Sequence, residues 1–363
     1  MTSTNLKAIS ESGVSIWLDD LSRDRLQTGS LAKLIEESCV VGVTTNPSIF
    51  SAAISGSTLY REDILALKEE GLTTSAIVTE LTTSDVRNAC DLFLPTFLES
   101  NQQDGRVSIE VDPRLAYNTS ETISQGKQLH SLVNRPNLLI KVPATLDGLP
   151  AIEELTAQGI SVNVTLIFSK PRYEAVMDSY LRGIERRLSN GLPVSDIHSV
   201  ASFFVSRIDA DIDKKLDAIE ENHPLRGKAA IANAVLAYEA FVKVSQSARW
   251  LKLAERGANM QRPLWASTGV KDKSYDSTRY VVELVAAHCV NTMPESTLNE
   301  VRLHGAAHGD SITPAISRSH KVFADLLNVG IDFTAVVNFL EDDGVVKFEK
   351  AWEELLANVE AVS

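Results

Sequence analysis

The chain has few cysteines and no long apolar run, and these two features argue against a disulfide-rich protein and a membrane-spanning one. Its 363 residues include only three cysteines, Cys39, Cys90 and Cys289, which lie far apart. An odd number of widely spaced cysteines does not suit a disulfide framework or a thiolate metal site. No stretch approaches the roughly 20 apolar residues of a membrane-spanning helix, and residues 1–12 lack the basic start and apolar core of a secretory signal. We therefore expect a cytoplasmic protein with no membrane partner.

Positive charge is also in short supply. The chain carries 35 Lys and Arg against 48 Asp and Glu, which gives a formal net charge of −13. A protein with this balance has no global basic field to attract nucleic acid or an anionic membrane surface. Any anionic substrate must therefore be bound by a few local cations. With 44% hydrophobic and 23% charged residues, the composition is that of a globular protein with a sizeable core.

Short β-like runs alternate with longer amphipathic segments along most of the sequence. The runs that predict strands are Ser15–Leu18, Cys39–Thr44, Arg106–Val111, Leu138–Val142, Ser161–Phe168, Val200–Ile208 and Pro263–Ser267, with an eighth expected within Ala287–Leu298. The segments that predict helices include Ser30–Ser38, Ser84–Glu99, Ser120–Val133, Leu149–Gln158, Lys170–Ser189, Arg226–Arg256, Thr313–Leu327 and Phe333–Val359. Most of the strand runs are continuously apolar, as in strands that are buried on both faces.

Repeated βα alternation predicts parallel strands joined by right-handed crossovers, and eight such units close a (β/α)₈ TIM barrel. The alternative is an open doubly wound sheet, but no strand leads into G-x-G-x-x-G or G-x-x-x-x-G-K-[ST]. Because no linker or internal repeat interrupts the chain, we expect residues 1–363 to form one domain, with the helices of about 313–363 packed on the barrel.

Polar side chains gather at the carboxyl ends of the predicted strands, where barrel enzymes place their active groups. They are Asp19, Asp20, Thr44, Asn46, Glu110, Lys141, Asn163, Thr165, Ser202 and Arg207, the last of these taken as the end of the sixth strand. Because strand side chains alternate, Thr44 with Asn46, and Asn163 with Thr165, each fall on one side of their strand. Both pairs are expected to face the barrel axis beside Lys141.

Lys141 is the most informative of these residues because it follows the apolar run Leu138–Ile140. A lysine taken out of water tends to lose its proton, and the neutral amine can attack a carbonyl to form a Schiff base. The competing interpretation is a strand-end lysine that reaches solvent or pairs with a carboxylate. Because polar side chains also occur at the ends of the other predicted strands, the catalytic interpretation is favoured.

Five ordered sequence blocks resemble the transaldolase family. They are Trp17-Leu18-Asp19, Gly42-Val43-Thr44-Thr45-Asn46-Pro47-Ser48, Ile109-Glu110-Val111-Asp112-Pro113-Arg114-Leu115, Leu139-Ile140-Lys141-Val142-Pro143-Ala144-Thr145 and Val162-Asn163-Val164-Thr165-Leu166-Ile167-Phe168-Ser169. Trp265-Ala266-Ser267-Thr268 is similar to the family's seventh-strand segment, and the chain length resembles that of the larger bacterial members. Five blocks in family order are far more specific than a single motif.

The resemblance implies transfer of a dihydroxyacetone unit from a ketose phosphate, such as sedoheptulose 7-phosphate or fructose 6-phosphate. The acceptor would be glyceraldehyde 3-phosphate or erythrose 4-phosphate, as in the pentose phosphate pathway, with no cofactor and no metal. Lys141 would form the Schiff base, and Asp19 would exchange the proton of the donor C4 hydroxyl. Glu110 with Thr165 would hold and activate a water molecule.

The resemblance also implies a set of substrate-binding residues. Asn46 and Asn163 would hydrogen-bond substrate hydroxyls, with Thr44 and Ser202 as supporting polar groups. Arg207 resembles the family's phosphate-binding arginine. A second arginine often follows the seventh strand in this family, but here that stretch reads Ser267-Thr268-Gly269-Val270-Lys271-Asp272-Lys273, so Ser267 and a lysine, Lys271 or Lys273, are the candidates.

Two other function classes remain open beside transaldolase. The first is a lyase of the fructose-6-phosphate aldolase type, but those enzymes resemble one another in having Gln at the position of Glu110 and Tyr at that of Phe204. The second is a sugar-phosphate sensor without catalysis, since a fold does not fix a function. A sensor has no need of Lys141. The sequence leaves open whether the protein is a monomer or a homodimer.

Two further patterns are interpreted without a metal. His304 and His308 have a spacing that could bind a metal on a helix, but neighbouring glycines indicate a loop or helix end. Asp209, Asp211 and Asp213 lack the glycine and glutamate of a calcium loop and are interpreted as charges at a helix start.

Overall fold

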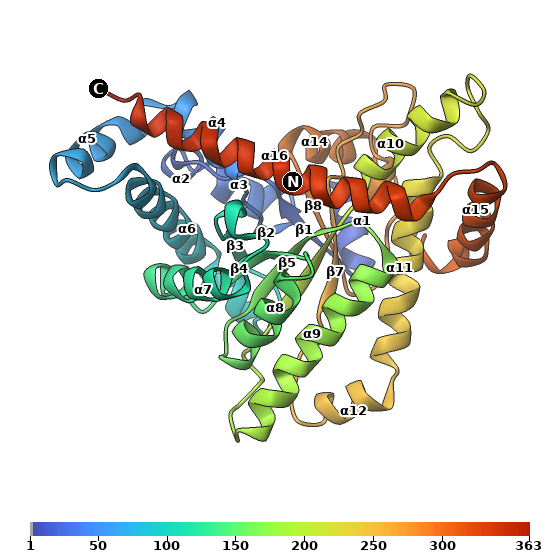
Figure 1. The fold of residues 1–363 in the computed structure, drawn as a ribbon, viewed down its shortest axis with the longest axis horizontal. Helices are drawn as coiled ribbons and strands as arrows, with labels where there is room; N and C mark the ends of the chain where they lie inside the picture. The colour runs from blue at the N-terminus through green and yellow to red at the C-terminus, as the bar shows by residue number, and fades with distance from the viewer. Residues whose placement is uncertain (1–2) are drawn as a thin grey trace.

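The computed structural model describes residues 3–363 and contains a closed barrel of eight parallel strands (Figure 1). The strands are β1 (Val14–Leu18), β2 (Val40–Val43), β3 (Arg106–Glu110), β4 (Leu138–Pro143), β5 (Val162–Ile167), β6 (Ser199–Phe204), β7 (Arg262–Ala266) and β8 (Cys289–Met293). They pair in sequence order, and β1 pairs with β8 to close the barrel. This architecture confirms the predicted (β/α)₈ barrel, including an eighth strand between residues 287 and 298.

Helices surround the barrel, and those of the first half are mostly short. In the first half they are α1 (Thr4–Glu11), α2 (Arg23–Gln27), α3 (Ser30–Glu37), α4 (Pro47–Gly56), α5 (Arg61–Glu69), α6 (Thr74–Glu99), α7 (Thr119–Val133), α8 (Gly148–Ala157) and α9 (Lys170–Ser189). In the second half they are α10 (Ser206–Asp217), α11 (Ala229–Ser245), α12 (Ala248–Ala254), α13 (Arg279–Val282), α14 (Glu295–His304), α15 (Ile316–Asn328) and α16 (Phe333–Glu360).

Three predicted boundaries are wrong, and the first of them concerns the site. The sixth strand ends at Phe204 instead of Ile208, so Arg207 lies in the first turn of α10 rather than on a strand. The sequence did not reveal this transition, because Ile208 resembles the apolar residues Phe203–Val205 in composition but belongs to a helical repeat with Ile212.

The other two boundaries concern helices. The segment predicted as one helix over Arg226–Arg256 forms α11 and α12, because Ser247 caps a new helix by accepting a hydrogen bond from the Trp250 amide. The helix predicted from Ser84 begins at Thr74, after the capping residue Thr73.

The long helix α16 lies across the end of the barrel at which the strands terminate. Figure 1 shows it running from α15 on one side of the molecule towards α4 and α5 on the other, and it contacts α4, α6, α10 and β5. Phe348 and Trp352 are buried on its inner face. Gly344 permits a close approach, since a Cβ atom there would lie 3.0 Å from Leu166. The helix therefore forms one wall of whatever the barrel mouth encloses.

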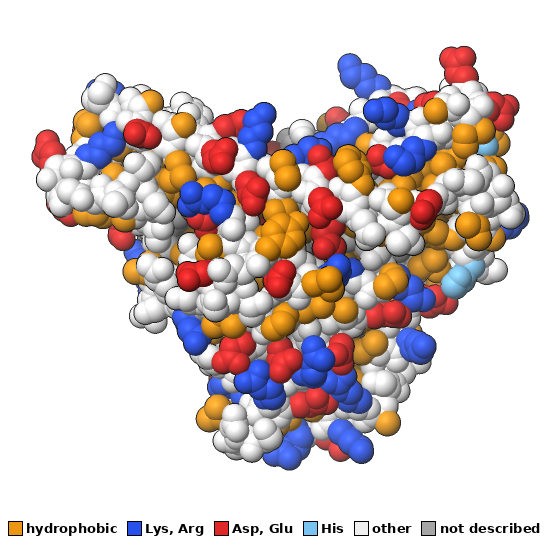
Figure 2. Space-filling view, in the orientation of Figure 1, with side chains coloured by type: hydrophobic (Ala, Val, Ile, Leu, Met, Phe, Trp, Pro, Cys, Tyr) orange, Lys and Arg blue, Asp and Glu red, His pale blue; other side chains and the backbone are white. Residues whose placement is uncertain are grey.

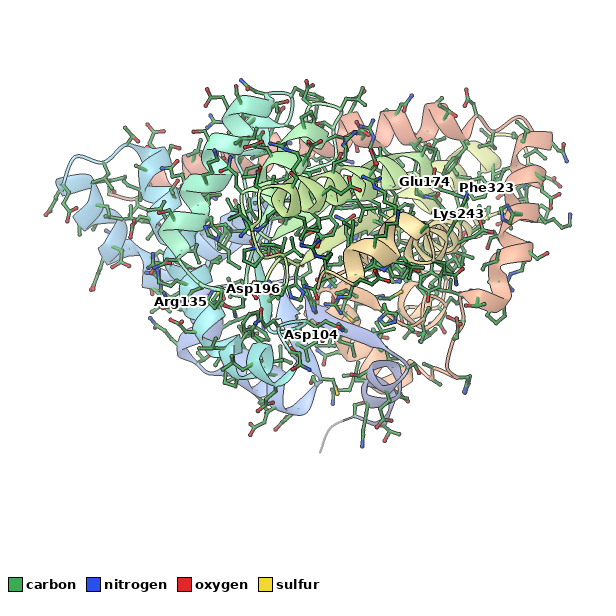
Figure 3. The ribbon with its side chains drawn as sticks, turned by 90° about the horizontal axis from the view of Figure 1, so that it is seen from below. Asp104, Arg135, Glu174, Asp196, Lys243 and Phe323 are labelled. Atoms are coloured by element: carbon green, nitrogen blue, oxygen red, sulfur yellow. The ribbon has the colours of Figure 1, made fainter. Side chains whose placement is uncertain are left out.

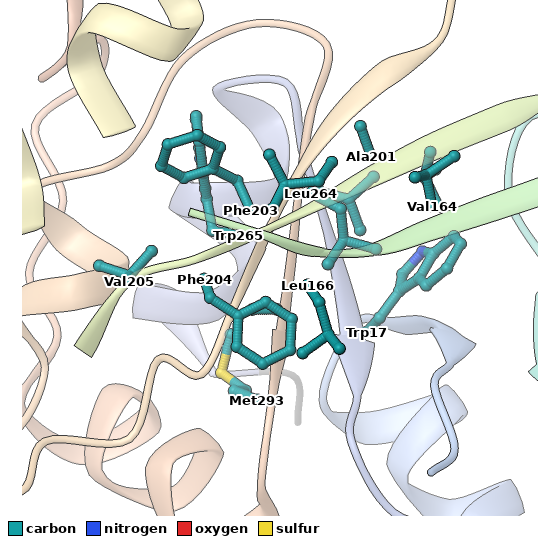
Figure 4. Packing of buried hydrophobic residues seen from close by; sticks show 14 of the residues in the cluster. Trp17, Val164, Leu166, Ala201, Phe203, Phe204, Val205, Leu264, Trp265 and Met293 are labelled. Atoms are coloured by element: carbon teal, nitrogen blue, oxygen red, sulfur yellow. The ribbon is translucent and has the colours of Figure 1, made fainter. Parts of the chain in front are cut away.

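The core lies between the barrel and its helices and is rich in aromatic contacts. Phe203 packs edge-on against Trp265, with ring centroids 6.1 Å apart, and against Tyr173 on α9 at 6.2 Å. Figure 4 shows Phe203 beside Trp265, with Phe204 and Leu166 on the other side of their strands. Such contacts fix the positions of β6, β7 and α9 relative to one another.

The outer surface carries many ion pairs, which Figure 2 shows as mixed blue and red side chains over α8 and α9. Arg186 pairs with Glu153 and Glu154, and Arg249 pairs with Asp178 and Glu185. Exposed pairs of this kind contribute little each to stability, about 0–1 kcal/mol.

Within residues 3–363, no helix taken singly is long and apolar enough to cross a membrane. Residues Thr313–Asn328 and Phe333–Glu360 meet the criteria of length and composition only as a pair, and the pair is bent by 97°.

Candidate active site

A cavity of about 160 Å³ opens at the carboxyl ends of the strands, under α16. Its lining residues are Asp19, Thr44, Asn46, Lys141, Thr165, Ser202, Phe204, Arg207, Ala266, Ser267, Gly269, Lys271, Thr292, Pro294 and Phe348. Nine of the eleven residues predicted from the sequence are in this set, and the two others, Glu110 and Asn163, do not line it but are hydrogen-bonded to Lys141 and Ser202, which do. We call it the mouth cavity.

Lys141 lies at the centre of the mouth cavity and is almost completely buried, with 5% of its side chain exposed. Its Nζ donates hydrogen bonds to the carbonyl oxygen of Thr45 at 3.0 Å and to Oε2 of Glu110 at 3.1 Å. The ring centroid of Phe348 is 5.5 Å from the same nitrogen. β3 and β4 place the pair side by side, because Glu110 and Lys141 are register partners in the sheet.

Glu110 combines a paired oxygen with an unpaired one. Oε2 accepts from Lys141, whereas Oε1 is buried and has no partner among the described residues. Burial raises the pKa of Glu110 to about 7, although the ammonium group of Lys141 opposes this shift. Thr165 Oγ1, which faces the mouth cavity, likewise has no hydrogen-bond partner in residues 3–363. A buried carboxyl of this kind can exchange protons near neutral pH.

The structure separates the two consecutive aspartates that follow β1. Asp19 lines the mouth cavity and accepts a hydrogen bond of 2.6 Å from Thr44 Oγ1. Asp20 turns away and accepts from Arg25 Nε at 2.8 Å. Burial raises the pKa of Asp19, and nearby Lys141 opposes the shift. Asp19 is therefore the carboxylate that can act on a molecule held beside Lys141.

Two asparagines take different places. Asn46 lines the mouth cavity and caps α4, with Oδ1 accepting from the Ile49 amide at 3.0 Å and Pro47 in the first turn. Asn163 is completely buried, donates to Ser108 Oγ and accepts from Ser202 Oγ at 2.7 Å. The structure therefore brings Ser202 to the cavity wall and Asn163 behind it.

Cationic groups mark one end of the mouth cavity. Arg207 is in the first turn of α10, with its guanidinium carbon 5.1 Å from the ring centroid of Phe204. Its Nη1 is buried without a partner among the described residues, and burial lowers its pKa. Ser267 and Lys271 line the same end, and Ser267 Oγ lies 3.0 Å from Ser206 Oγ. A guanidinium with a free nitrogen next to a lysine can bind a phosphate group.

Comparison with known proteins identifies the family. The sequence matches the family model described as Transaldolase/Fructose-6-phosphate aldolase over residues 16–359. The chain belongs to the transaldolase/fructose-6-phosphate aldolase family.

Relatives in this family are similar along almost their entire length. The chain is 56% identical to a transaldolase of Mycolicibacterium smegmatis over 354 residues, which are 97% of this chain and 95% of that protein. It is 54% identical to a transaldolase of Renibacterium salmoninarum, covering 98% and 96% of the two chains. Transaldolase 1 of Streptomyces avermitilis is 54% identical, with coverage of 99% and 95%. These matches confirm the predicted family and the predicted transaldolase enzyme.

Two neighbours of Asp19 and Lys141 in the mouth cavity, Thr292 and Phe348, were not predicted from the sequence. Thr292, from β8, lies 2.6 Å from Thr44 Oγ1 and so extends the hydrogen bonding of Asp19 across the barrel closure. Its place in a β-like run with polar alternation is a signal that could have found it. Phe348 on α16 covers Lys141, and nothing in its amphipathic helix distinguishes it from an ordinary core residue.

The structure also shows where Lys271, Lys273 and the two histidines lie. Lys271 lines the mouth cavity, whereas Lys273 is exposed and does not. His304 ends α14, and His308 follows in the loop beyond it, as expected for a helix end. Across residues 3–363, no group of three or more His, Cys, Asp or Glu side chains is arranged to hold a metal ion.

Proposed function

We propose that this protein transfers a dihydroxyacetone unit from a ketose phosphate to an aldose phosphate through a Schiff base on Lys141. The donor is sedoheptulose 7-phosphate or fructose 6-phosphate, and the acceptor is glyceraldehyde 3-phosphate or erythrose 4-phosphate. The observation that carries the proposal is the buried Nζ of Lys141, 3.1 Å from Glu110 in a cavity that also holds Asp19 and Arg207.

In the first half of the reaction, the ammonium group of Lys141 passes a proton to the ionised carboxylate of Glu110, 3.1 Å away, and the resulting amine attacks the ketone carbon of the donor to form a carbinolamine. Loss of water gives a protonated imine, which withdraws electrons from the adjacent C3–C4 bond. Asp19 takes the proton of the C4 hydroxyl as that bond breaks, and the shortened aldose leaves. The three-carbon enamine stays on Lys141.

In the second half, the enamine carbon attacks the aldehyde of the acceptor, and Asp19 returns its proton to the new hydroxyl. Water then hydrolyses the imine and releases the longer ketose. The buried position of Asp19 beside Lys141, with its raised pKa, supports a carboxyl that both accepts and returns a proton.

Glu110 and Thr165 are proposed to hold the water used in imine formation and hydrolysis. Support comes from the two oxygens, Glu110 Oε1 and Thr165 Oγ1, which have no protein partner in the described part of the chain. The pKa of about 7 suits a carboxyl that passes protons in both directions. The proposed mechanism thus assigns each carboxyl one proton-transfer task.

Substrate binding is proposed to use both ends of the mouth cavity. The Nδ2 of Asn46 and the hydroxyls of Thr44 and Ser202 would contact sugar hydroxyls, while Asn163 would orient Ser202 from behind. Arg207, with Ser267 and Lys271, would bind the phosphate group. Because the chain carries a net charge of −13, these local cations would have to overcome the repulsion of an anionic substrate.

The deciding experiment is trapping of the Schiff base. Borohydride added with fructose 6-phosphate should attach a reduced three-carbon fragment to Lys141, located by peptide mass spectrometry. Lys141→Met should abolish the label and lower activity by several orders of magnitude, as expected on losing a covalent nucleophile. Lys243→Met, which alters an exposed lysine of α11, should leave both unchanged. A label on another lysine, or activity of Lys141→Met within about tenfold of the wild type, would contradict the assignment.

A lyase that splits the ketose phosphate without passing on the fragment is the alternative within the same family. Glu110 and Phe204, which line or adjoin the mouth cavity, favour transfer over that alternative. A coupled assay with fructose 6-phosphate separates the two, because a transferase requires erythrose 4-phosphate whereas a lyase releases dihydroxyacetone without it. The sensor hypothesis predicts binding without turnover in either assay.

Three further expectations belong to the proposal. We propose that the protein acts in the cytoplasm, which agrees with three cysteines that are all free. We propose one domain over residues 1–363, supported by the contacts that α16 makes with α4, α6 and β5. Whether the protein acts as a monomer or a homodimer can be measured by light scattering.

A further inference from the structure

A second cavity, of about 350 Å³, lies at the opposite end of the barrel from the mouth cavity. Among the residues that line it are Arg106, Leu139, His198, Phe241, Trp250 and Arg262. Arg106 begins β3 and Arg262 begins β7, whereas Glu110 ends β3. Arg106 and Glu110 are four residue steps apart along the strand, about 13 Å at 3.3 Å per residue. We call this space the lower cavity.

Arg106 is a buried cation without an anionic partner. Only 1% of the residue is exposed, and Nε and Nη2 both donate to the same carbonyl oxygen, that of Gln102. Its guanidinium lies over the ring of Phe97 at 5.1 Å, and no carboxylate of the described chain pairs with it. Nη1 has no hydrogen-bond partner at all within residues 3–363.

Arg262 adds a second guanidinium to the lower cavity, but this one is neutralised. It donates to Ser15 Oγ, to the Gln103 carbonyl and to Asp104 Oδ1 at 2.9 Å. The carboxylate of Asp104, which Figure 3 labels, pairs directly with Arg262, whereas it acts on Arg106 without a direct contact. Burial and the proximity of Arg262 lower the pKa of Arg106 to about 9.

His198 is a second residue whose side chain has a nitrogen without a hydrogen-bond partner in the described chain. It directly precedes β6, and its Nε2 is buried without a partner in the described chain. Burial and the two arginines lower its pKa to about 3, so the ring is neutral and can donate one N–H at neutral pH. Arg106 and His198 thus border the same cavity, each with an unsatisfied nitrogen.

Unsatisfied buried donors are rare in folded proteins, and an unpaired buried charge is strongly disfavoured. If the side chains at this end of the barrel had only a structural role, Arg106 would be expected to pair with a carboxylate. Instead, the residues that line the lower cavity with Arg106 include the aromatic side chains of Phe241 and Trp250. A volume of about 350 Å³ falls within the range of metabolite-binding pockets, which start near 300 Å³.

We propose that the lower cavity binds a small organic anion, whose phosphate or carboxylate group accepts from Arg106 and His198 and whose apolar or ring portion lies against Phe241 and Trp250. This site is separate from the mouth cavity and does not depend on the reaction proposed there. Its ligand class is defined by an oxyanion joined to an apolar body.

The test uses calorimetric titration with phenyl phosphate, benzoate, inorganic phosphate and, as a neutral control, phenol. The protein is the full chain carrying Arg207→Ala, so that the phosphate-binding end of the mouth cavity is weakened. Phenyl phosphate or benzoate should bind at one site per chain, more tightly than inorganic phosphate, and phenol should not bind. Preference between the first two tells whether phosphate or carboxylate is the natural group.

Variants then locate the site. Adding Arg106→Gln should weaken binding by at least about tenfold, as expected for loss of a charge-assisted contact, whereas the exposed Arg302→Gln should have no effect. Because Arg106→Gln removes a buried side chain and could impair folding, Ser245→Glu provides a second test. Ser245 lines the lower cavity and is only partly buried, so this change supplies an internal carboxylate while Arg106 stays in place.

Ser245→Glu should abolish anion binding and raise the thermal unfolding temperature, since the new carboxylate neutralises Arg106. No binding of either aromatic anion at millimolar concentration would overturn the proposal. Binding that survives Ser245→Glu unchanged would overturn it as well, because the anion would then occupy another place.

Discussion

The buried pair of Lys141 and Glu110 makes stability depend on pH in a way that a single substitution should expose. Both side chains are almost fully buried, at 5% and 3% exposed, and their charged atoms are 3.1 Å apart. Lys141→Met removes the cation and leaves Glu110 buried alone. Breaking a buried pair from one side typically destabilises a protein by about 3–5 kcal/mol, because the remaining charge is uncompensated.

The pH dependence follows from the raised pKa of Glu110. The folded protein holds this proton up to about pH 7, whereas the unfolded chain releases it near 4.5. The unfolded state therefore binds fewer protons between these values, and stability falls as pH rises through that window. At about 1.4 kcal/mol per pKa unit, the wild type loses about 2 kcal/mol through this group between pH 5.5 and 8, and little more above that.

In Lys141→Met the attraction that lowered the pKa of Glu110 is gone, so its pKa moves further up and the loss continues to pH 8. The difference in unfolding free energy between wild type and variant should thus be larger at pH 8 than at pH 5.5 by about 1–2 kcal/mol. Urea unfolding followed by tryptophan fluorescence at both pH values measures it.

The double variant Lys141→Met with Glu110→Gln is the control, because a neutral amide cannot titrate. It should regain most of the lost stability at pH 8 and show no extra pH dependence. If Lys141→Met is destabilised equally at both pH values, or if Glu110→Gln does not remove the difference, the assignment of an uncompensated Glu110 is refuted.

Three other predictions concern activity. Arg207→Ala should raise KM for fructose 6-phosphate and erythrose 4-phosphate by about 10- to 100-fold, with little change in activity on unphosphorylated dihydroxyacetone. The control Lys273→Ala should leave the activity on both substrate classes unchanged. If Arg207→Ala lowers activity equally on both classes, Arg207 has a structural role. Asp19→Ala should still permit borohydride trapping with the donor but nearly abolish C–C cleavage, whereas Glu110→Ala should slow trapping itself; equal trapping defects would argue against two separate tasks. Because Glu110 acts as a base only when ionised, kcat should rise with pH through about 7, and a profile that keeps this limb in Glu110→Gln would assign it to another group.

The sequence predicted the barrel because its strands are continuous apolar runs that differ clearly from the amphipathic helices between them. It also predicted which residues share the mouth cavity, since polar groups at strand ends such as Lys141 and Thr44 must converge in a closed parallel barrel. The sequence did not predict how deeply each of these residues lies within the barrel. Asn163 and Thr165 have the same strand parity, yet Asn163 lies one layer further in and is satisfied by Ser108 and Ser202.

Tertiary contacts explain the other misses. Phe348 reaches Lys141 only because a helix from the far end of the sequence crosses the barrel mouth, and local pattern carries no record of such a crossing. Arg207 was expected on a strand because the apolar run did not reveal where β6 ends and α10 begins. The lower cavity was not predicted, because in the sequence Arg106 looks like an ordinary polar residue at the start of a strand. Only the three-dimensional structure shows that Arg106 Nη1 has no hydrogen-bond partner among residues 3–363.

The hydrogen bond between Thr44 and Thr292 joins residues 248 positions apart and adjoins the seam where β8 meets β1. Contacts this distant in sequence form late and slowly, since the intervening chain must be ordered first. During refolding, most helices can therefore appear before Asp19 acquires the Thr44 and Thr292 arrangement that orients it. Recovery of activity should therefore lag behind recovery of the helical circular-dichroism signal. The rate at which turnover returns would then report the rate at which the barrel closes.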